Sequence, residues 1–268
     1  MKKKFKILCL QTKSSKDPHK NINMLEDLFK RVSSKVDLIC LPECVAVFSD
    51  EKKNINLFLD KFRDSFFNLI KQQAVHKKCC IQIGSVPEKF DDYKFVNRSY
   101  IIDQKGSCKS FYDKINLFDV KLNDSEYYYE SRNYVSGKKV VVSNLPIGKL
   151  GMSICYDLRF PNLYKKLAKK GADFFSIPAA FTYTTGKAHW HSLIRARAIE
   201  NGCFVFAAAQ NGIHDNGRKT FGHSMIVNPW GQILAEAKAK NKFITSEINL
   251  DEIKLVRKKM PSMTNYGK

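Results

Sequence analysis

The chain has 268 residues, 44% of them hydrophobic, which is enough to bury the core of one large domain or of two small ones. Lys and Arg outnumber Asp and Glu by 46 to 26, and the formal net charge is +20. The basic residues are scattered through nearly every predicted helix and loop and form no stripe interleaved with aromatics. This favours a solvated surface over a nucleic-acid interface, while an anionic substrate or partner stays open.

Strand-like and helical patterns alternate along the chain, as is typical of an α/β protein. The first helical segment, 19–35, carries Ile22, Leu25 and Phe29 on one face. No Pro-, Gly- or Ser-rich linker divides the sequence, so we predict one domain over residues 1–259 and an irregular tail over 260–268. The predicted strands are 5–11, 36–42, 79–86, 98–103, 139–144, 150–155, 173–178, 203–209, 223–228, 232–235 and 243–248, and the other predicted helices are 55–78, 162–170, 187–200 and 251–259.

The longest apolar run, 203–209, is too short to span a bilayer. The basic start of the chain resembles that of a signal peptide, but the apolar stretch behind it stops at Leu10 and no small-residue cleavage site follows. The eight cysteines form no C-x-x-C pair, and we expect seven of them to be buried, reduced thiols. These features predict a cytoplasmic protein with no membrane partner.

The segment 151–161 carries the strongest chemical signal. A strand-like run leads to Cys155 at a bend, and Pro161 then opens a helical pattern. We expect such a thiol to be exposed at the edge of the sheet and to face the free amides of the helix N-terminus, which favour a thiolate and a developing oxyanion. Glu43 and Lys114 lie at comparable strand ends. Together a Glu, a Lys and a Cys predict acyl transfer through a thioester.

A cysteine nucleophile needs a base, because a free thiol has a pKa of about 8.5 and is mostly neutral at pH 7. No histidine lies near Cys155 in the sequence, although a distant one could converge on it. Glu43 is another candidate, since partial desolvation would raise the pKa of its carboxyl into a range useful for proton transfer. Lys114 and the backbone N–H of Tyr156 would stabilise the oxyanion. Taken singly, the three residues could also be a core cysteine, a loop carboxylate and a solvated lysine.

The residues around these positions resemble the nitrilase superfamily of carbon–nitrogen hydrolases. The resemblance implies Glu43 as general base, Lys114 as the cation that stabilises the oxyanion, and Cys155 as nucleophile. It also implies a second glutamate that orients the lysine and the amide; Glu130 matches this position, with Glu126 nearby as the alternative. The implied fold is a four-layer αββα sandwich, usually paired into a dimer across helices and the C-terminal segment. The matching segments are 41–43, 84–88, 112–114, 151–161 and 222–231.

Within the superfamily, the residues that follow Cys155 look like the amidase branch. The segment 181–190 resembles two groups of relatives, the ω-amidases and the deaminated-glutathione amidases, which both cleave amides of α-ketoglutarate-like acids. The segments 195–200 and 207–212 lean towards the second group.

An acidic substrate needs a cation, and the matching residue in these relatives is Arg159, which could hold a carboxylate bidentately. Phe181, Thr185 and Tyr156 are expected to contribute to the same substrate pocket. The alternative for Arg159 is a structural ion pair with Asp157 or with a partner chain.

Three features depart from these relatives. Asn116 stands where they usually have His, His191 stands where they usually have Glu, and the tail from Met260 lacks their basic ending. None of these changes removes a catalytic residue. His189 and His191 diverge at an i, i+2 spacing on a helix, so no metal site is predicted, and the implied reaction needs no metal or organic cofactor.

The sequence thus predicts a thiol amidase that converts deaminated glutathione to α-ketoglutarate and cysteinylglycine, as a homodimer or higher homo-oligomer. The nearest alternative is an ω-amidase that acts on α-ketoglutaramate with the same residues. An alternative of another class is a non-catalytic, basic nucleic-acid-binding protein on the same fold. The intact Glu43, Lys114 and Cys155 argue against it.

Overall fold

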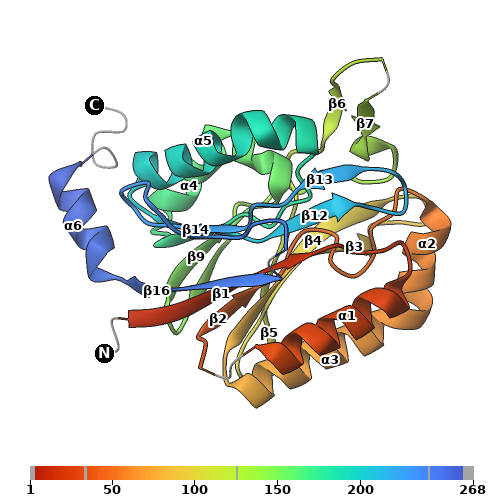
Figure 1. Cartoon of the computed structure of the whole chain (residues 1–268), viewed down its shortest axis with the longest axis horizontal. Helices are drawn as coiled ribbons and strands as arrows, with labels where there is room; N and C mark the ends of the chain where they lie inside the picture. Colours follow the sequence, from red (N-terminus) through yellow and green to blue (C-terminus); the bar gives the residue numbers. More distant parts are fainter. Residues whose placement is uncertain (1–3, 33–34, 125, 241, 262–268) are drawn as a thin grey trace.

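The computed structural model describes residues 4–32, 35–124, 126–240 and 242–261. Two β-sheets face each other in the centre, and a pair of helices covers the outer face of each (Figure 1). The predicted four-layer αββα sandwich is therefore confirmed. The covering helices are α1 (Pro18–Arg31) and α3 (Arg63–Lys77) on the first sheet, and α4 (Pro161–Lys169) and α5 (Tyr183–Asn201) on the second.

The first sheet joins N-terminal strands to late segments of the chain. Its strands are β1 (Lys4–Thr12), β2 (Leu38–Cys40), β3 (Cys80–Lys89), β4 (Phe95–Ile102), β5 (Cys108–Asp113), β12 (Ala209–Ile213), β13 (Lys219–Phe221) and β16 (Phe243–Asn249). They lie in the order β13-β12-β1-β2-β3-β4-β5, and β16 pairs with β1 in antiparallel fashion. β2 and β3 are parallel, and two antiparallel steps through β4 restore the same direction in β5. The carboxyl ends of β2 and β5 therefore lie at the same edge of the sheet.

The second sheet has a parallel centre and antiparallel flanks. Its strands are β8 (Val142–Leu145), β9 (Gly148–Met152), β10 (Phe174–Ser176), β11 (Phe204–Ala207), β14 (Met225–Val227) and β15 (Ile233–Glu236). The order is β15-β14-β11-β10-β9-β8, in which β9, β10 and β11 are parallel. A separate hairpin of β6 (Asp119–Lys121) and β7 (Tyr127–Tyr129) projects beside the sandwich (Figure 1).

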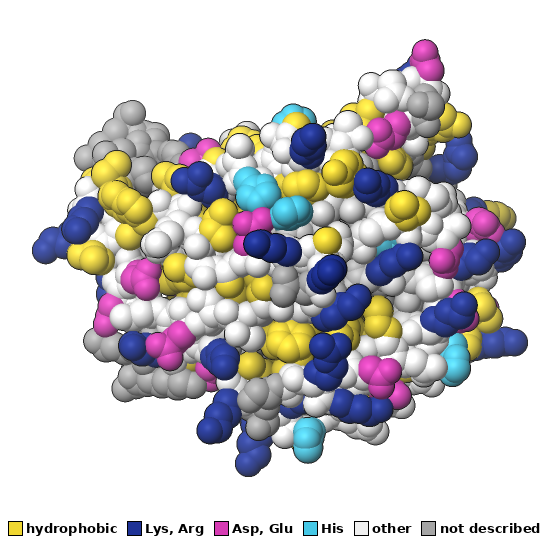
Figure 2. Space-filling model, in the orientation of Figure 1, with side chains coloured by type: hydrophobic (Ala, Val, Ile, Leu, Met, Phe, Trp, Pro, Cys, Tyr) yellow, Lys and Arg dark blue, Asp and Glu magenta, His cyan; other side chains and the backbone are white. Residues whose placement is uncertain are grey.

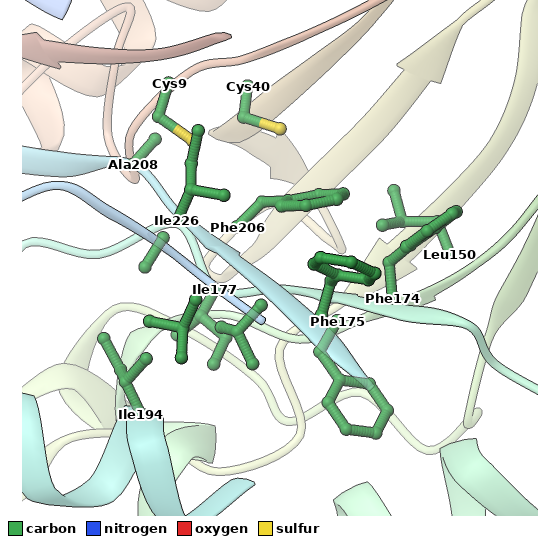
Figure 3. Packing of buried hydrophobic residues seen from close by; sticks show 14 of the residues in the cluster. Cys9, Cys40, Leu150, Phe174, Phe175, Ile177, Ile194, Phe206, Ala208 and Ile226 are labelled. Carbon is green, nitrogen blue, oxygen red and sulfur yellow. The ribbon is translucent and has the colours of Figure 1, made fainter. Parts of the chain in front are cut away.

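Alternation along the strands builds two cores. In β1, Ile7 and Cys9 belong to the core between the sheets, whereas Leu8 and Leu10 pack under α1 and α3. Successive side chains of a strand point to opposite faces, so one apolar run serves both layers. Figure 3 shows Cys9 and Cys40 of the first sheet across from aromatic and aliphatic side chains of the second, among them Phe174, Phe206 and Ile226.

The predicted elements exist, with three instructive differences. The long helix 55–78 is interrupted: α2 (Lys52–Leu57) passes into a π-helical turn (Phe58–Phe62) before α3. The predicted strand 150–155 ends at Met152, and a 3-10 helix (Cys155–Arg159) follows. The predicted strand 203–209 is two strands, because the chain leaves the second sheet after β11 and enters the first at β12. The predicted hairpin is confirmed as β14 and β15, and α6 (Asp251–Lys259) is confirmed as well.

Two of the cysteines expected to be buried are not fully buried: Cys44 is half-buried and Cys108 is exposed, while five others lie in the interior besides Cys155. Within the described ranges, no helix combines the length and the apolar character needed to cross a lipid bilayer. Of the predicted tail, 260–268, residues 262–268 lie outside the described residues.

Candidate active site

A cavity of about 270 Å³ opens where the carboxyl ends of strands from both sheets meet. It brings together side chains that lie far apart in the sequence. The loops after β2, β5, β9 and β10 and the β6–β7 hairpin all contribute to its wall. The residues that matter for the chemistry are Glu43, Lys114, Glu130, Cys155 and Arg218.

Glu43 lies in the loop after β2 and is almost completely buried, at 3% exposed. Its Oε1 accepts hydrogen bonds from Lys114 Nζ at 3.0 Å and from Asn97 Nδ2 at 3.1 Å, and its Oε2 accepts one from the backbone N–H of Ala180 at 2.7 Å. The strand that carries Gly84 passes very close to this loop. A Cβ at Gly84 would lie 2.2 Å from the carbonyl oxygen of Pro42, so a larger residue would displace the loop that holds Glu43.

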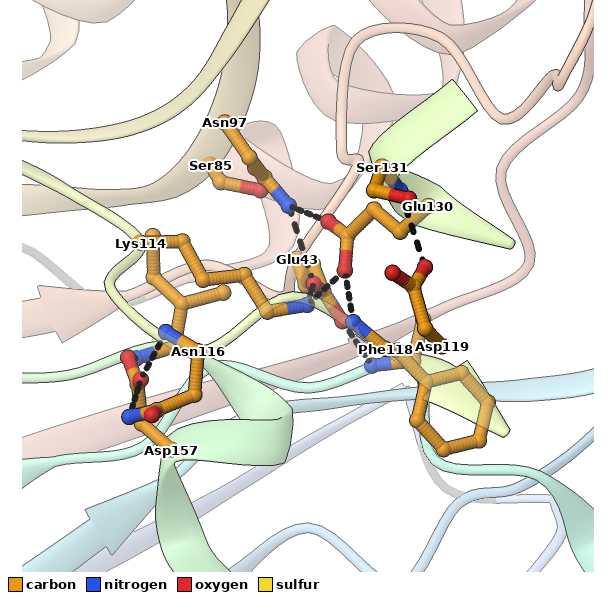
Figure 4. A network of polar contacts seen from close by, with 12 residues as sticks. Glu43, Ser85, Asn97, Lys114, Asn116, Phe118, Asp119, Glu130, Ser131 and Asp157 are labelled. Atoms are coloured by element: carbon orange, nitrogen blue, oxygen red, sulfur yellow. Dashed lines mark hydrogen bonds and ion pairs between the residues drawn. The ribbon is translucent and has the colours of Figure 1, made fainter. Parts of the chain in front are cut away.

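Lys114 follows β5 and lies between two carboxylates (Figure 4). Its Nζ is 3.0 Å from Glu43 and 2.8 Å from Glu130 Oε2, and its side chain is 2% exposed. Glu130 also accepts a hydrogen bond from the backbone N–H of Phe118 at 2.7 Å. Asn97 Nδ2 is shared between Glu43 and Glu130, at 3.1 Å from each. Of the two glutamates considered for the second carboxylate, it is Glu130 that contacts Lys114.

Cys155 begins the 3-10 helix after β9 and has a φ of 48°, a left-handed conformation that is strained for a residue with a side chain. Its backbone N–H donates to the carbonyl of Pro178 at 2.9 Å. The expectation that the thiol is exposed at the sheet edge is wrong, because Cys155 is only 5% exposed and meets the cavity from a nearly buried position.

The charges of the site oppose the effects of burial. Burial would raise the pKa of Glu43, but the charge of Lys114 and the interactions with Cys155 and Lys114 outweigh it and hold this pKa below its usual value. The raised pKa expected for Glu43 is therefore wrong. Burial would lower the pKa of Lys114, yet the Glu130 and Glu43 carboxylates raise it well above its usual value.

The thiol of Cys155 behaves differently. Burial and the neighbouring Glu43 charge raise the pKa of Cys155 well above its usual value, and Lys114 offsets this only in part. The expectation of a thiolate favoured by the helix N-terminus is thus wrong for the resting site. The arrangement consists of a neutral thiol beside a carboxylate that can accept its proton, and an ammonium ion.

Asp157 fixes the turn that carries the nucleophile. Its Oδ2 accepts hydrogen bonds from the backbone N–H of Ile154 at 2.9 Å and from the Tyr112 hydroxyl at 2.7 Å. Its Oδ1 accepts from the backbone and the side-chain amide of Asn116, at 2.9 and 2.8 Å. Asn116 therefore ties the end of β5 to the turn around Cys155.

The residues expected to bind substrate divide into two groups. Tyr156, Phe181 and Thr185 line the cavity. Arg159 is not among its lining residues; the guanidinium lies 5.2 Å from the ring centroid of Phe181, which does line the cavity, and 3.3 Å from His189 Nδ1. In the part of the chain that the structure describes, the Asp157 carboxylate is taken up by Ile154, Tyr112 and Asn116, and no ion pair joins it to Arg159.

Arg218 is a cation of the cavity that sequence reasoning missed. It lies in the tight turn between β12 and β13, where its carbonyl accepts a hydrogen bond from His214 N at 2.9 Å. No local pattern marks it, since a basic residue after Gly217 in a turn is ordinary. Asn97, the third residue of β4, was missed as well, because a single amide within a strand pattern carries no signal of its own.

A second polar cluster lies outside the cavity. His191 Nε2 and His223 Nδ1 both contact Glu236 Oε1, at 2.9 and 2.6 Å. Within the described ranges this is the group of side chains whose ligand atoms, all within 4.8 Å of one another, could hold a metal ion. His189 does not take part and contacts Arg159 instead.

An αββα sandwich with a buried Glu, Lys and Cys at the strand ends matches what the sequence resemblance implies for a carbon–nitrogen hydrolase. The family model described as carbon-nitrogen hydrolase matches residues 7–258, and the chain belongs to this family.

Relatives of nearly equal length support this assignment. The chain is 35% identical over 262 residues to a deaminated glutathione amidase of Yersinia enterocolitica, covering 97% of this chain and 92% of the relative. It is 38% identical over 266 residues to a deaminated glutathione amidase of a Synechocystis strain, covering 97% of each.

Solved structures support the same fold. The C. elegans NitFhit protein superposes with a TM-score of 0.90 at 33% identity, covering 98% of this chain and 65% of that one. Saccharomyces cerevisiae Nit3, a member of the nitrilase superfamily, superposes with a TM-score of 0.84 at 28% identity, covering 100% of this chain and 98% of that one.

Proposed function

We propose that the protein hydrolyses deaminated glutathione to α-ketoglutarate and cysteinylglycine through a thioester on Cys155. The observation that carries the proposal is that Glu43, Lys114 and Cys155 line one cavity, where the Glu43 carboxylate contacts both the Lys114 ammonium and the Cys155 thiol. The names of the full-length relatives support the choice of substrate.

In the acylation step, Cys155 Sγ attacks the carbonyl carbon of the amide while its proton passes to Glu43. Negative charge develops on the carbonyl oxygen, and the Lys114 ammonium and the backbone N–H of Tyr156 stabilise it. Glu43 then gives the proton to the departing amine nitrogen, the C–N bond breaks and the thioester remains.

In the deacylation step, Glu43 takes a proton from water as the water oxygen attacks the thioester carbon. The C–S bond breaks, the acid leaves, and the proton returns to the Cys155 sulfur. Glu130 keeps Lys114 charged and aimed at the reacting oxygen, because its carboxylate holds the ammonium at 2.8 Å.

The substrate end of the cavity has an aromatic wall formed by Tyr156 and Phe181, with Thr185 beside it. Arg159 lies against this wall, and we assign it to the carboxylate of the keto-acid part. The same residues would serve an ω-amidase acting on α-ketoglutaramate, so the two substrates must be compared directly.

The proposal includes a cytoplasmic homodimer or higher homo-oligomer, with one domain over residues 1–259 and the tail 260–268 as a candidate part of the dimer interface. It includes no nucleic-acid or membrane partner. Figure 2 shows Lys and Arg spread over one face of the molecule and interspersed with Asp and Glu, which supports a solvated surface.

The experiment compares the wild type with Cys155→Ala. We expect a covalent acyl adduct on the wild type with slow substrates, seen by mass spectrometry, and no adduct or turnover in the variant at an unchanged melting temperature. Normal turnover by Cys155→Ala would contradict the mechanism. A preference in kcat/KM beyond about tenfold, roughly 1.4 kcal/mol, decides between deaminated glutathione and α-ketoglutaramate.

A further inference from the structure

Arg218 is a partly buried cation of the cavity; the charges of Glu43 and Asp50 act on it, but within the described residues neither carboxylate contacts it directly. Its Nη2 donates to the carbonyl of Ala180 at 2.9 Å, and within the described ranges its buried Nε has no hydrogen-bond partner and no carboxylate forms an ion pair with it. A buried, unpaired donor atom of a charged group is costly unless a ligand satisfies it.

Aromatic rings hold the guanidinium in place. It lies 4.8 Å from the ring centroid of Tyr128, 5.6 Å from that of Phe48 and 5.8 Å from that of Phe118. All three rings line the cavity, as does Arg218. Rings on several sides fix the planar group without neutralising it, which suits a site that receives an anion.

The position of Arg218 relative to Glu43 shows which part of a substrate it faces. Ala180 donates its N–H to Glu43 Oε2 at 2.7 Å and accepts from Arg218 through its carbonyl. Lys114 contacts the other oxygen, Oε1. Lys114 therefore contacts the base through Oε1, and Arg218 is linked through Ala180 to Oε2. In the proposed mechanism Lys114 serves the reacting carbonyl oxygen and Glu43 protonates the departing amine, which leaves the Oε2 side, with Arg218, for the amine.

We propose that Arg218 forms a binding site for an anionic group, such as a carboxylate, on the amine that leaves. This inference rests on the proposed function and deepens it. In deaminated glutathione the leaving amine is a dipeptide with a free carboxylate, and two extended residues reach about 7 Å. Ala180 hydrogen-bonds both Glu43 and Arg218, so the guanidinium lies one residue away from the base.

A site of this kind would let the enzyme distinguish between related amide substrates. The keto-acid carboxylate is common to deaminated glutathione and α-ketoglutaramate, and Arg159 is assigned to it. Only deaminated glutathione carries a second carboxylate, on the part that leaves; α-ketoglutaramate releases ammonia. A guanidinium that binds this second carboxylate favours amides of acidic peptides over primary amides.

The test measures kcat/KM for both substrates in the wild type, Arg218→Gln, Arg218→Lys and a control, Lys219→Gln. Lys219 is the exposed neighbouring cation, so its variant makes the same charge change outside the cavity. We expect Arg218→Gln to lower kcat/KM for deaminated glutathione by about 30-fold or more and for α-ketoglutaramate by far less. Arg218→Lys should fall between, since it keeps the charge and loses the planar fork. The control should match the wild type for both substrates.

An equal loss for both substrates in a folded Arg218→Gln, or no loss for either, would overturn the inference while leaving the amidase activity in place. If the wild type hydrolyses neither substrate, the proposed function fails instead. Inhibition of the wild type by the product provides a measurement that needs no variant. Cysteinylglycine should bind about tenfold or more tightly than its C-terminal amide, which lacks the carboxylate; equal inhibition would count against the site.

Discussion

At the scale of single residues, the protonation states of Glu43 and Cys155 decide how the reaction can begin. A carboxylate with a lowered pKa and a thiol with a raised pKa leave the nucleophile neutral at rest. Lys114 keeps the proton on Cys155 rather than on Glu43, because it stabilises the carboxylate more directly than it would stabilise a thiolate. The thiol is therefore activated only as its proton moves to Glu43 during attack.

The substitution Glu43→Gln tests this distribution. It keeps the shape of the side chain and removes the base, so we expect kcat to fall by about 10²- to 10⁴-fold. The wild-type kcat/KM should stay level through neutral pH and fall only as the pH drops through the lowered pKa of Glu43, below the ordinary value for glutamate. Steady-state pH profiles measure both effects.

The matched control for Glu43→Gln is Glu126→Gln. Glu126 is a nearby carboxylate that accepts from Thr184 Oγ1 at 3.1 Å and lies outside the residues lining the cavity. Its variant should keep the wild-type profile. An acid limb at the ordinary glutamate pKa, or a Glu43→Gln enzyme with near-normal kcat, would show that another group removes the thiol proton.

Part of the site could be predicted because its residues stand at the ends of recognisable strands. Glu43 and Cys155 follow apolar runs, and their positions alone point to the carboxyl ends of strands, which lie in different sheets. Arg218 and Asn97 could not be found in this way. Arg218 reaches the cavity only because the β12–β13 turn folds back over it, and Asn97 does so from the first half of β4. The pKa directions were missed since they depend on charges brought together from distant segments.

At the scale of elements, the turn after β9 depends on a single buried carboxylate. Asp157 accepts four hydrogen bonds, which join the turn to β5 through Tyr112 and Asn116. Two of the four donors face each carboxylate oxygen of Asp157. An asparagine at this position would place its NH₂ group against two of these donors, whichever way its amide is turned. The conformation of Cys155, with its φ of 48°, is held by these contacts.

We therefore expect Asp157→Asn to lower the free energy of unfolding by about 2–3 kcal/mol and to reduce kcat, because the turn loses its anchor. Asn116→Ala removes one side-chain donor only and should cost about 1 kcal/mol. Urea unfolding followed by circular dichroism measures both. Equal stabilities for Asp157→Asn and the wild type would mean that the turn is held by other contacts.

The strands themselves illustrate what local pattern can and cannot predict. The apolar run 203–209 was predicted as one strand because every residue suits a buried strand. The chain nevertheless changes sheets at Ala208, and local hydrophobicity carries no information about which sheet receives each half. The short strands β6 and β7 were missed because neither is long enough to show the alternation of apolar and polar residues that marks a strand.

At the scale of the whole molecule, the cavity is closed by contacts between the two ends of the sequence. Gln210, at the start of β12, donates from Nε2 to the carbonyl of Glu43 at 2.9 Å and to Ser14 Oγ at 2.8 Å. His214 contacts the carbonyl of Ser14 at 2.8 Å and stacks on Phe48, with ring centroids 3.8 Å apart. The loops after β1 and β2 and the β12–β13 turn thus form one unit, which no single segment of sequence could reveal.

This unit makes the stability of the fold depend on pH through His214. Burial lowers the pKa of His214 from 6.5 to about 4. The unfolded chain therefore binds a proton at this residue more readily than the folded one, and stability is lost as the pH falls from about 6.5 to about 4, by about 3 kcal/mol in all. Urea unfolding at pH 7.5, 5.5 and 4 measures the loss.

His214→Gln should unfold with a smaller pH dependence over this window, whereas His76→Gln, at an exposed position on α3, should keep the wild-type slope. An NMR titration that places the pKa of His214 near 6.5, or an unchanged slope in His214→Gln, would show that the loop unit takes up a proton without opening.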